Sequence, residues 1–234
     1  MMKALVTGAA RGLGLGLCSI LAQRGYEVFG ACRNSTPELD ALGIRVISGV
    51  DVSTKDAIAA LRQGVGDEKL DLLVCNAGLN GSFKAIGIQD VDFETMAYEY
   101  QVNALGAMRT VNAVLPALRQ GAKIIFITTG RGVTGKAPPT PGQWGYRMSK
   151  IAVHTMAYQL ADEVRPRGIA VRLISPGAVN TDLMKAIYAA GRTTQPPETL
   201  PSPLAAAERL LPRIEELSID TTGAWVNFSG EVWG

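Results

Sequence analysis

The sequence predicts a single α/β domain with a seven-stranded parallel sheet that carries helices on both faces. The 234 residues suit one large domain. Hydrophobic residues make up 47% of the chain, enough to build a sizeable core. Short apolar runs, often β-branched, alternate with longer helical patterns, and this alternation is typical of strand–helix–strand units with parallel strands.

The predicted strands share one property, which is that most of them are continuously apolar rather than alternating. Such runs indicate strands that are buried on both faces of a sheet. They span residues 3–7, 27–31, 44–49, 72–75, 123–128, 170–174 and 224–228.

Helices are predicted between these strands, over residues 14–24, 54–63, 93–119, 149–165 and 203–217. Two segments rich in proline and glycine, 136–142 and 191–203, lie between strong elements. We therefore expect loops over a site rather than linkers, and one domain over residues 1–234.

Charge and composition exclude several classes of function. The net charge is only +2, with 23 basic and 21 acidic residues mixed along the chain, so we expect no nucleic-acid partner. The apolar runs are too short to span a membrane, and the first residues do not resemble a secretion signal. Three widely spaced cysteines and one histidine predict neither a disulfide framework nor a metal site. A cytoplasmic protein is the expectation.

The first predicted strand leads into a glycine-rich turn, and a predicted helix follows. Residues 7–14 read Thr-Gly-Ala-Ala-Arg-Gly-Leu-Gly. In a Rossmann fold this turn lies at the carboxyl end of the first strand, where the N–H groups of a helix N-terminus bind a pyrophosphate. Glycine also serves any tight loop, but the position after strand one predicts a dinucleotide site.

The spacing Gly-x-x-x-Gly-x-Gly, at Gly8, Gly12 and Gly14, resembles the short-chain dehydrogenase/reductase family. Further family motifs follow in order and span nearly the whole chain: Asp51-Val52, Asn76-Ala77-Gly78, Asn103, Tyr146-x-x-x-Lys150 and Pro176-Gly177-x-Val179-x-Thr181. The pattern Tyr-Arg-x-Ser-Lys and the ending Asn-Phe-Ser-Gly-Glu-Val-Trp resemble the branch of C-factor-like and sniffer-like carbonyl reductases.

The resemblance implies a nicotinamide cofactor and a set of residues that bind it. The glycine-rich turn would line the phosphates, the acid after strand three would contact the adenine, and the segment after strand six would contact the nicotinamide end. The implied cofactor-binding residues are Gly8, Arg11, Gly12, Leu13, Gly14, Arg33, Asp51, Val52, Asn76, Ala77, Gly78, Tyr146, Lys150, Pro176, Gly177, Val179 and Thr181.

Carbonyl reduction needs a hydride for carbon and a proton for oxygen, and a cofactor would carry the hydride. A tyrosine phenol is a poor acid near neutral pH unless a nearby cation lowers its pKa. Tyr146 and Lys150 are four residues apart, which places them on one helical face. Such a pair is often merely amphipathic. The resemblance makes Tyr146 the proton donor, and Asn103 the residue that holds a relay water.

The chain departs from the family at the hydroxyl that polarises the substrate carbonyl. Thr129 stands where the family has serine, and its hydroxyl offers the same donor and acceptor with a stiffer χ1. The alternative is a strand-end threonine that satisfies backbone groups. The distance along the chain from Thr129 to Tyr146 is longer than usual in the family, and the extra residues fall in 136–142.

Cofactor preference depends on the residues after the second strand. Sites that prefer NAD(H) place a carboxylate there, but this chain has Cys32 followed by Arg33. Arg11 and Arg33 are predicted to clamp a 2′-phosphate, which favours NADP(H) over NAD(H). The alternative is two solvated surface arginines.

The substrate pocket is expected beneath a loop around residues 182–203, with Leu183, Met184, Thr134 and Trp144 in its wall. These mostly apolar side chains favour a small neutral carbonyl or alcohol substrate. His154 is interpreted as a structural or cleft-edge residue. The resemblance also implies a homodimer or homotetramer.

We therefore expect NADPH-dependent reduction of a ketone or aldehyde, or the reverse oxidation. An enoyl reductase on the same fold is an alternative, but the spacing of Tyr146 and Lys150 counts against it. A nucleotide-binding sensor or signalling protein without chemistry is another alternative, and the retention of Asn103, Tyr146 and Lys150 argues against it.

Overall fold

The computed structural model describes residues 1–130 and 142–233. Its centre is a seven-stranded, wholly parallel sheet with the strand order β3-β2-β1-β4-β5-β6-β7. This sheet confirms the predicted fold class. The strands are β1 (Lys3–Thr7), β2 (Glu27–Ala31), β3 (Arg45–Ile47), β4 (Leu70–Cys75), β5 (Leu118–Ile127), β6 (Ala170–Ser175) and β7 (Trp225–Asn227).

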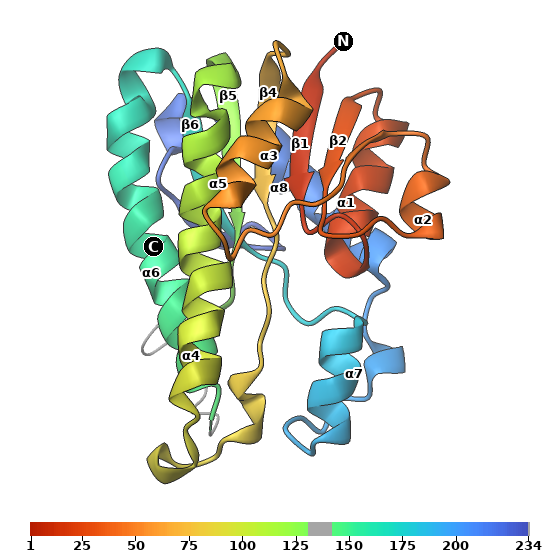
Figure 1. The fold of residues 1–234 in the computed structure, drawn as a ribbon, viewed down its shortest axis with the longest axis vertical. Coiled ribbons are helices and arrows are strands. Elements are labelled where there is room, and N and C mark those ends of the chain that lie inside the picture. Colours follow the sequence, from red (N-terminus) through yellow and green to blue (C-terminus); the bar gives the residue numbers. More distant parts are fainter. Residues whose placement is uncertain (131–141, 234) are drawn as a thin grey trace.

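Helices cover both faces of the sheet (Figure 1). One face packs against α3 (Asp56–Val65), α5 (Gly106–Val114) and α6 (Trp144–Val164). The other packs against α1 (Gly12–Gln23), α2 (Pro37–Asp40) and α8 (Pro203–Glu215). Neighbours in β1 enter different cores, with Leu5 on the first face and Val6 on the second. The continuously apolar strands are therefore explained by burial on both sides.

The predicted helix over 93–119 is divided in the structure. It consists of α4 (Phe93–Tyr100), a π-helical turn over Gln101–Leu105 and α5. Pro116 follows in a short 3₁₀ turn, and β5 begins at Leu118 rather than at residue 123. Proline cannot continue an α-helix, which explains the earlier end.

Three other boundaries differ from the sequence prediction. Helix α6 begins at Trp144, five residues before the predicted start. The expected loop around 182–203 begins with a helix, α7 (Asp182–Ala189), whose first turn is capped by the Thr181 hydroxyl. The short helix α2 was not predicted, although Thr36 caps it and Pro37 occupies its first turn.

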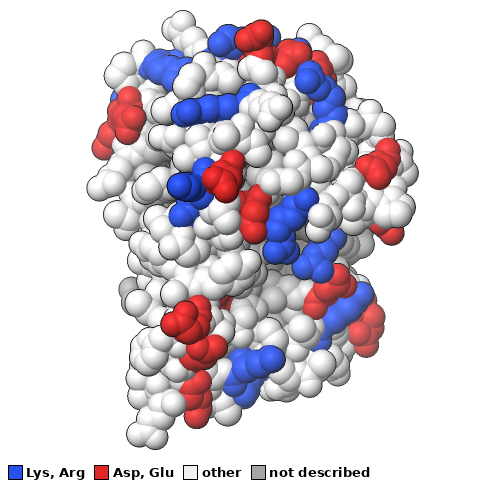
Figure 2. All heavy atoms as spheres, viewed as in Figure 1, with Lys and Arg blue, Asp and Glu red and all other residues white. Residues whose placement is uncertain are grey.

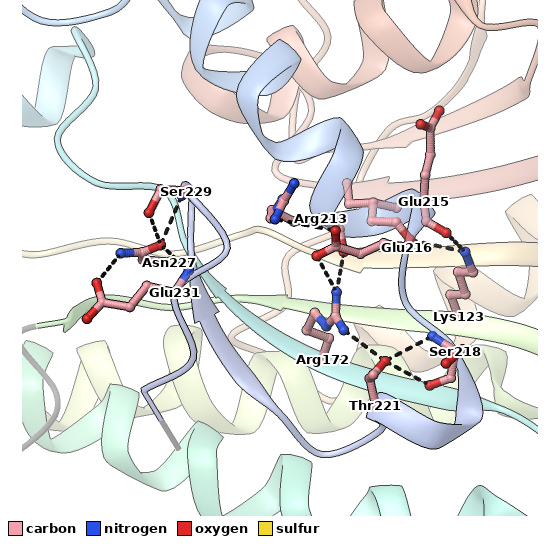
Figure 3. Close-up of polar contacts among 11 residues, drawn as sticks. Lys123, Arg172, Arg213, Glu215, Glu216, Ser218, Thr221, Asn227, Ser229 and Glu231 are labelled. Carbon is pink, nitrogen blue, oxygen red and sulfur yellow. Dashed lines mark hydrogen bonds and ion pairs between the residues drawn. The ribbon is translucent and has the colours of Figure 1, made fainter.

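Two cations on the sheet, one buried and one half-buried, hold the end of α8 (Figure 3). Arg172 on β6 donates to the carbonyl oxygen of Arg213 at 2.8 Å, to a Glu216 carboxylate oxygen at 3.1 Å and to the Thr221 hydroxyl at 2.9 Å. Lys123 on β5 donates to the last carbonyl groups of the same helix. These bonds satisfy helix C-terminal carbonyls that would otherwise lack partners.

Basic and acidic side chains are interspersed over the face shown in Figure 2. Within residues 1–130 and 142–233, no helix is long and apolar enough to cross a membrane. In that same part of the chain, no group of His, Cys, Asp and Glu side chains is arranged to hold a metal ion.

Candidate active site

The candidate site lies at the carboxyl edge of the sheet. Strand β1 lies between β2 and β4. The chain therefore adds strands β2 and β3 on one side of β1 and strands β4 to β7 on the other. Doubly wound folds bind ligands where the strand order reverses in this way. Helices α4 and α7 extend beyond the same edge, in the lower part of Figure 1.

The ends of β1 and β4 are joined by a compact set of hydrogen bonds. The Thr7 hydroxyl accepts from the backbone N–H groups of Asn76 and Ala77, both at 3.2 Å. In return, the Asn76 side-chain amide donates to the Thr7 carbonyl at 3.0 Å. These hydrogen bonds therefore join the Asn-Ala-Gly segment to the start of the glycine-rich turn.

Glycine is required in this turn because the backbone is crowded. A Cβ on Gly14 would lie 2.1 Å from the Gly8 carbonyl oxygen and 2.6 Å from the Asn76 side-chain nitrogen. Gly8 also has a φ of +69°, which L side chains rarely adopt. In the described chain, α1 has no side-chain cap, and its first turn has no acidic residue. Its N–H groups and partial positive charge suit an anion.

The two predicted phosphate-binding arginines differ in their surroundings. Arg11 is exposed and lies 3.6 Å from an Asp182 carboxylate oxygen at the start of α7. Arg33 is also exposed and follows β2. The pKa of Asp51 is lowered chiefly by a hydrogen bond from Ser53, with smaller contributions from Arg33 and Arg109. The described contacts place each arginine at this edge of the sheet without forming a clamp.

Tyr146 and Lys150 both lie on α6, as the spacing predicts. The Lys150 ammonium is 5.9 Å from the centre of the Tyr146 ring and donates to the Ile127 carbonyl at 2.9 Å. Lys150 is only 5% exposed, and burial lowers its pKa to about 8. At pH 7 the side chain is still mainly cationic.

Asn103 lies in the π-helical turn and is buried. Its side chain accepts from Leu79 N–H and donates to the Leu79 carbonyl, both at 2.8 Å. It also donates to the Ser149 hydroxyl at 3.0 Å, and Ser149 in turn donates to the Tyr146 carbonyl at 2.7 Å. The structure therefore brings Asn103 to the two α6 residues through Ser149, which the sequence indicates only as part of the pattern Tyr-Arg-x-Ser-Lys.

Gly78 leaves room for the Asn103 and Lys150 side chains because it carries no Cβ. A Cβ at that position would lie 3.1 Å from the Asn103 side-chain oxygen and 3.4 Å from the Lys150 ammonium. Thr129, half-buried, lies two residues beyond Ile127, which ends β5 and whose carbonyl holds Lys150. Thr134 lies outside the described residues.

The segment after β6 reaches the glycine-rich turn. Val179 is buried, and the Thr181 methyl group would lie 3.3 Å from a Cβ placed on Gly12. Gly177 has a φ of +75° and lies against the Phe228 ring. The predicted phosphate and nicotinamide segments therefore meet at one edge of the sheet.

The residues predicted for the substrate wall are separated in the structure. Trp144, 39% exposed, lines a cavity of about 480 Å³ beside the start of α6. Leu183 and Met184 lie on α7, and neither is among the residues that line this cavity. The cavity is lined by Gly81, Ser82, Phe83, Lys84, Ala85, Asp90, Val91, Asp92, Thr95 and Trp144.

Two further residues shape this region and were missed in the sequence. Buried Glu99 on α4 accepts from the backbone N–H groups of Gly81 and Ser82, at 2.6 and 2.9 Å. Arg192 donates to the carbonyl oxygens of Phe83 and Lys84, at 3.0 and 2.9 Å. The burial of Glu99 is visible only in the structure, and the partners of Arg192 are more than a hundred residues away along the chain.

A glycine-rich turn after β1, a helix N-terminus without an acid, and a Tyr–Lys pair at the same edge of the sheet are features of the dinucleotide-binding class of doubly wound proteins. The family profile of the short chain dehydrogenases matches residues 2–191. The chain therefore belongs to the short-chain dehydrogenase family, and it is an oxidoreductase that acts on CH–OH or C=O groups.

Individual relatives agree with this membership. A 1-hydroxy-2-glutathionyl-2-methyl-3-butene dehydrogenase from Rhodococcus sp. (strain AD45) is 30% identical over 232 residues, which cover 98% of both chains. The C-signal protein of Myxococcus xanthus is 34% identical over 69% of this chain and 90% of its own. The fold is similar to that of an NADPH-bound carbonyl reductase from chicken fatty liver, with a TM-score of 0.83, 24% identity and coverage of 100% and 99%.

Proposed function

We propose that this protein uses NADP(H) to reduce a ketone or aldehyde to an alcohol, or to catalyse the reverse oxidation, with Tyr146 as the proton donor or acceptor. The observation that carries the proposal is the position of the Tyr–Lys pair. Lys150 is buried against the Ile127 carbonyl, at the sheet edge where the glycine-rich turn also lies, and its ammonium is 5.9 Å from the Tyr146 ring.

The residues at this edge fit a dinucleotide. The crowding around Gly8 and Gly14 leaves a bare backbone that a phosphate can approach, and the uncapped N-terminus of α1 favours its charge. When bound, NADP(H) supplies or accepts the hydride. The holding residues would be Gly8, Arg11, Gly12, Leu13, Gly14, Arg33, Asp51, Val52, Asn76, Ala77, Gly78, Tyr146, Lys150, Pro176, Gly177, Val179 and Thr181.

Preference for NADP(H) over NAD(H) rests on charge. Cys32 stands after β2 where sites for NAD(H) carry a carboxylate, and burial raises the pKa of its thiol. Arg33 follows it and is exposed. Arg11 lies at the start of α1, where its guanidinium can leave the exposed pair with Asp182 for a 2′-phosphate.

This chain's own groups would handle the proton. The Lys150 cation favours the phenolate form of Tyr146, so that the phenol gives its proton more readily to the carbonyl oxygen. The Thr129 hydroxyl would donate a hydrogen bond to the same oxygen and so polarise the carbonyl. Asn103 would hold a water that relays protons, and its side-chain bonds to Leu79 and Ser149 would keep its π-helical turn in place.

We further propose a small neutral substrate, bound beneath the segment 182–203, with Trp144, Leu183, Met184 and Thr134 in its wall. The Rhodococcus relative is named as a dehydrogenase of a glutathione conjugate, so larger alcohols belong among the compounds to test. Three buried free cysteines fit a cytoplasmic protein. A homodimer or homotetramer remains the expected assembly.

One finding favours a second function. The Myxococcus relative is named C-signal, a signalling role. A nucleotide-binding sensor needs the cofactor cradle, but it does not need a proton donor. The presence of Tyr146 beside a buried lysine therefore supports the enzyme over the sensor.

The test is consumption of NADPH, with NADH in parallel, across aliphatic, aromatic and cyclic carbonyls, and of NADP⁺ with the matching alcohols. Tyr146→Phe removes the proton donor, and Tyr158→Phe, on the exposed side of α6, is the control. Turnover that prefers NADPH and is lost only in Tyr146→Phe supports the proposal. NADPH binding without turnover of any compound would favour the sensor.

A further inference from the structure

Two side chains of α6, one helical turn apart, hold consecutive residues at the end of β5. Lys150 donates to the Ile127 carbonyl at 2.9 Å. His154 places its Nε2 atom 2.7 Å from the Thr128 hydroxyl oxygen. The next residue in the chain is Thr129, the hydroxyl proposed to polarise the substrate.

The same stretch of backbone is also held from other directions. Thr128 N–H donates to the Ile174 carbonyl of β6 at 2.9 Å. Gly130 lies so close to the Trp233 ring that a Cβ on it would be 2.7 Å from a ring carbon. Thr129 is therefore the central residue of a segment whose neighbours are fixed on both sides.

The His154 ring is itself fixed. It is 7% exposed and meets Trp225 edge to face, with ring centroids 4.8 Å apart. The Trp225 indole N–H donates to the Ser175 hydroxyl at 3.1 Å, and the Trp233 ring meets Trp225 edge to face with centroids 4.9 Å apart. Burial, and then the charge of Lys150, lower the pKa of His154 to about 4, so the ring is neutral at physiological pH. A neutral ring in a fixed orientation makes one defined bond to Thr128.

We propose that His154 is a positioning residue for the reaction, which acts through Thr128 to hold the end of β5 so that the Thr129 hydroxyl meets the substrate carbonyl. This inference rests on the role of Thr129 in the proposed function. Threonine has a stiffer χ1 than serine, so its hydroxyl adjusts less to a displaced backbone. A displacement of about 1 Å can cost a large part of the catalytic rate.

The experiment compares His154→Phe, Thr128→Val and the double variant at saturating NADPH. Phenylalanine keeps a ring against Trp225, and valine keeps the shape of threonine, so each removes chiefly the hydrogen bond. We expect each single variant to lower kcat roughly three- to tenfold, as for the loss of one neutral hydrogen bond. The double variant should lose no more than either single variant, with an unchanged Kd for NADPH.

Two further variants separate positioning from a general loss of stability. His154→Gln retains a hydrogen-bonding group and should recover part of kcat. Thr110→Val is the control, because the buried Thr110 hydroxyl bonds at 2.8 Å to the Gly106 carbonyl within α5. It should lower stability and leave kcat unchanged.

His154 is the only histidine, so its ring signals in nuclear magnetic resonance need no assignment. We expect a single neutral tautomer across the neutral pH range, and altered Nε2 signals in Thr128→Val. A ring that titrates near pH 6.5, the ordinary value, with signals insensitive to Thr128→Val, would overturn the proposal even if the catalytic variants fail to fold.

The activity results also separate this inference from the proposed function. Loss of turnover in Thr129→Val, with kcat unchanged in His154→Phe and Thr128→Val, would refute the positioning role and leave the proposed function intact. Full turnover in Thr129→Val would refute the role of Thr129 and, with it, that of His154.

Discussion

Replacing Lys150 with methionine is expected to abolish turnover and to change how stability depends on pH. Methionine keeps an apolar stem in the same buried space but carries no charge. In the native protein Lys150 is almost fully buried, and its pKa is lowered from 10.5 to about 8. The folded protein therefore holds this proton less firmly than the unfolded chain does.

The magnitude follows from linkage between protonation and folding. At about 1.4 kcal/mol for each pH unit, burying the ammonium costs the native state about 3 kcal/mol at neutral pH. Between pH 8 and 10.5 the unfolded chain binds more protons than the native state, so the free energy of unfolding rises with pH. Most of this gain, about 2–3 kcal/mol, should appear between pH 7 and 10.

The assay is urea unfolding at pH 7, 8, 9 and 10 for wild type, Lys150→Met and the exposed-site control Lys69→Met. Other groups with perturbed pKa values, such as Lys123 and Tyr26, are present in all three proteins and cancel in the differences. Wild type and Lys69→Met should gain stability relative to Lys150→Met as pH rises. Parallel pH curves for wild type and Lys150→Met would refute the reasoning.

Three other perturbations test the remaining parts of the site. Arg33→Asp should weaken NADPH binding roughly ten- to hundredfold while leaving NADH binding much less affected; equal losses in calorimetric titrations would contradict the phosphate role. Gly14→Ala places a Cβ 2.1 Å from the Gly8 carbonyl oxygen and should lower the free energy of unfolding by about 1–3 kcal/mol. The control Gly87→Ala places its Cβ 3.6 Å from the nearest atom, on Asp90, and should leave that free energy unchanged. Arg192→Ala removes the two hydrogen bonds to the carbonyl oxygens of Phe83 and Lys84 and should raise KM roughly three- to tenfold, with a smaller change in kcat. An unchanged KM would exclude a role for Arg192 in substrate binding.

The sheet could be predicted from the sequence because burial on both faces leaves a strong local trace. Most strand positions are apolar because neighbouring side chains enter different cores, as Leu5 and Val6 do. The start of α7 was also readable, since Thr181 caps the helix and Asp182 follows in its first turn. The glycine and prolines further along, at 191–203, favour a loop and obscure this signal.

Other boundaries depend on contacts that no local pattern contains. The first residues of α6 are poor helix formers, and the helix begins early where the Ser82 hydroxyl accepts from Tyr146 N–H at 3.3 Å. The π-helical turn coincides with the bonds between Asn103 and the Leu79 backbone. Both partners are distant in sequence, so periodicity alone predicts the wrong boundaries.

The same distinction holds for the candidate site. Motif spacing predicted which residues gather at the sheet edge, because their elements and order determine where they lie. It did not predict that Asn103 would be linked to Tyr146 by Ser149, and it left open whether His154, which is buried, is structural or at a cleft edge. Those details depend on side-chain directions, which only the packed structure defines.

The packing of the first helix against the last has a consequence during synthesis. A Cβ on Gly16 of α1 would lie 2.4 Å from the Pro203 carbonyl oxygen, so the two helices meet backbone to backbone. At about 5–20 residues per second, α1 leaves the ribosome tens of seconds before α8 exists. Through that interval the apolar side of α1, including Leu17 and Leu21, has no partner from α8. Nascent chains should therefore depend on chaperones until translation nears its end, and products truncated before α8 should be cleared by proteases.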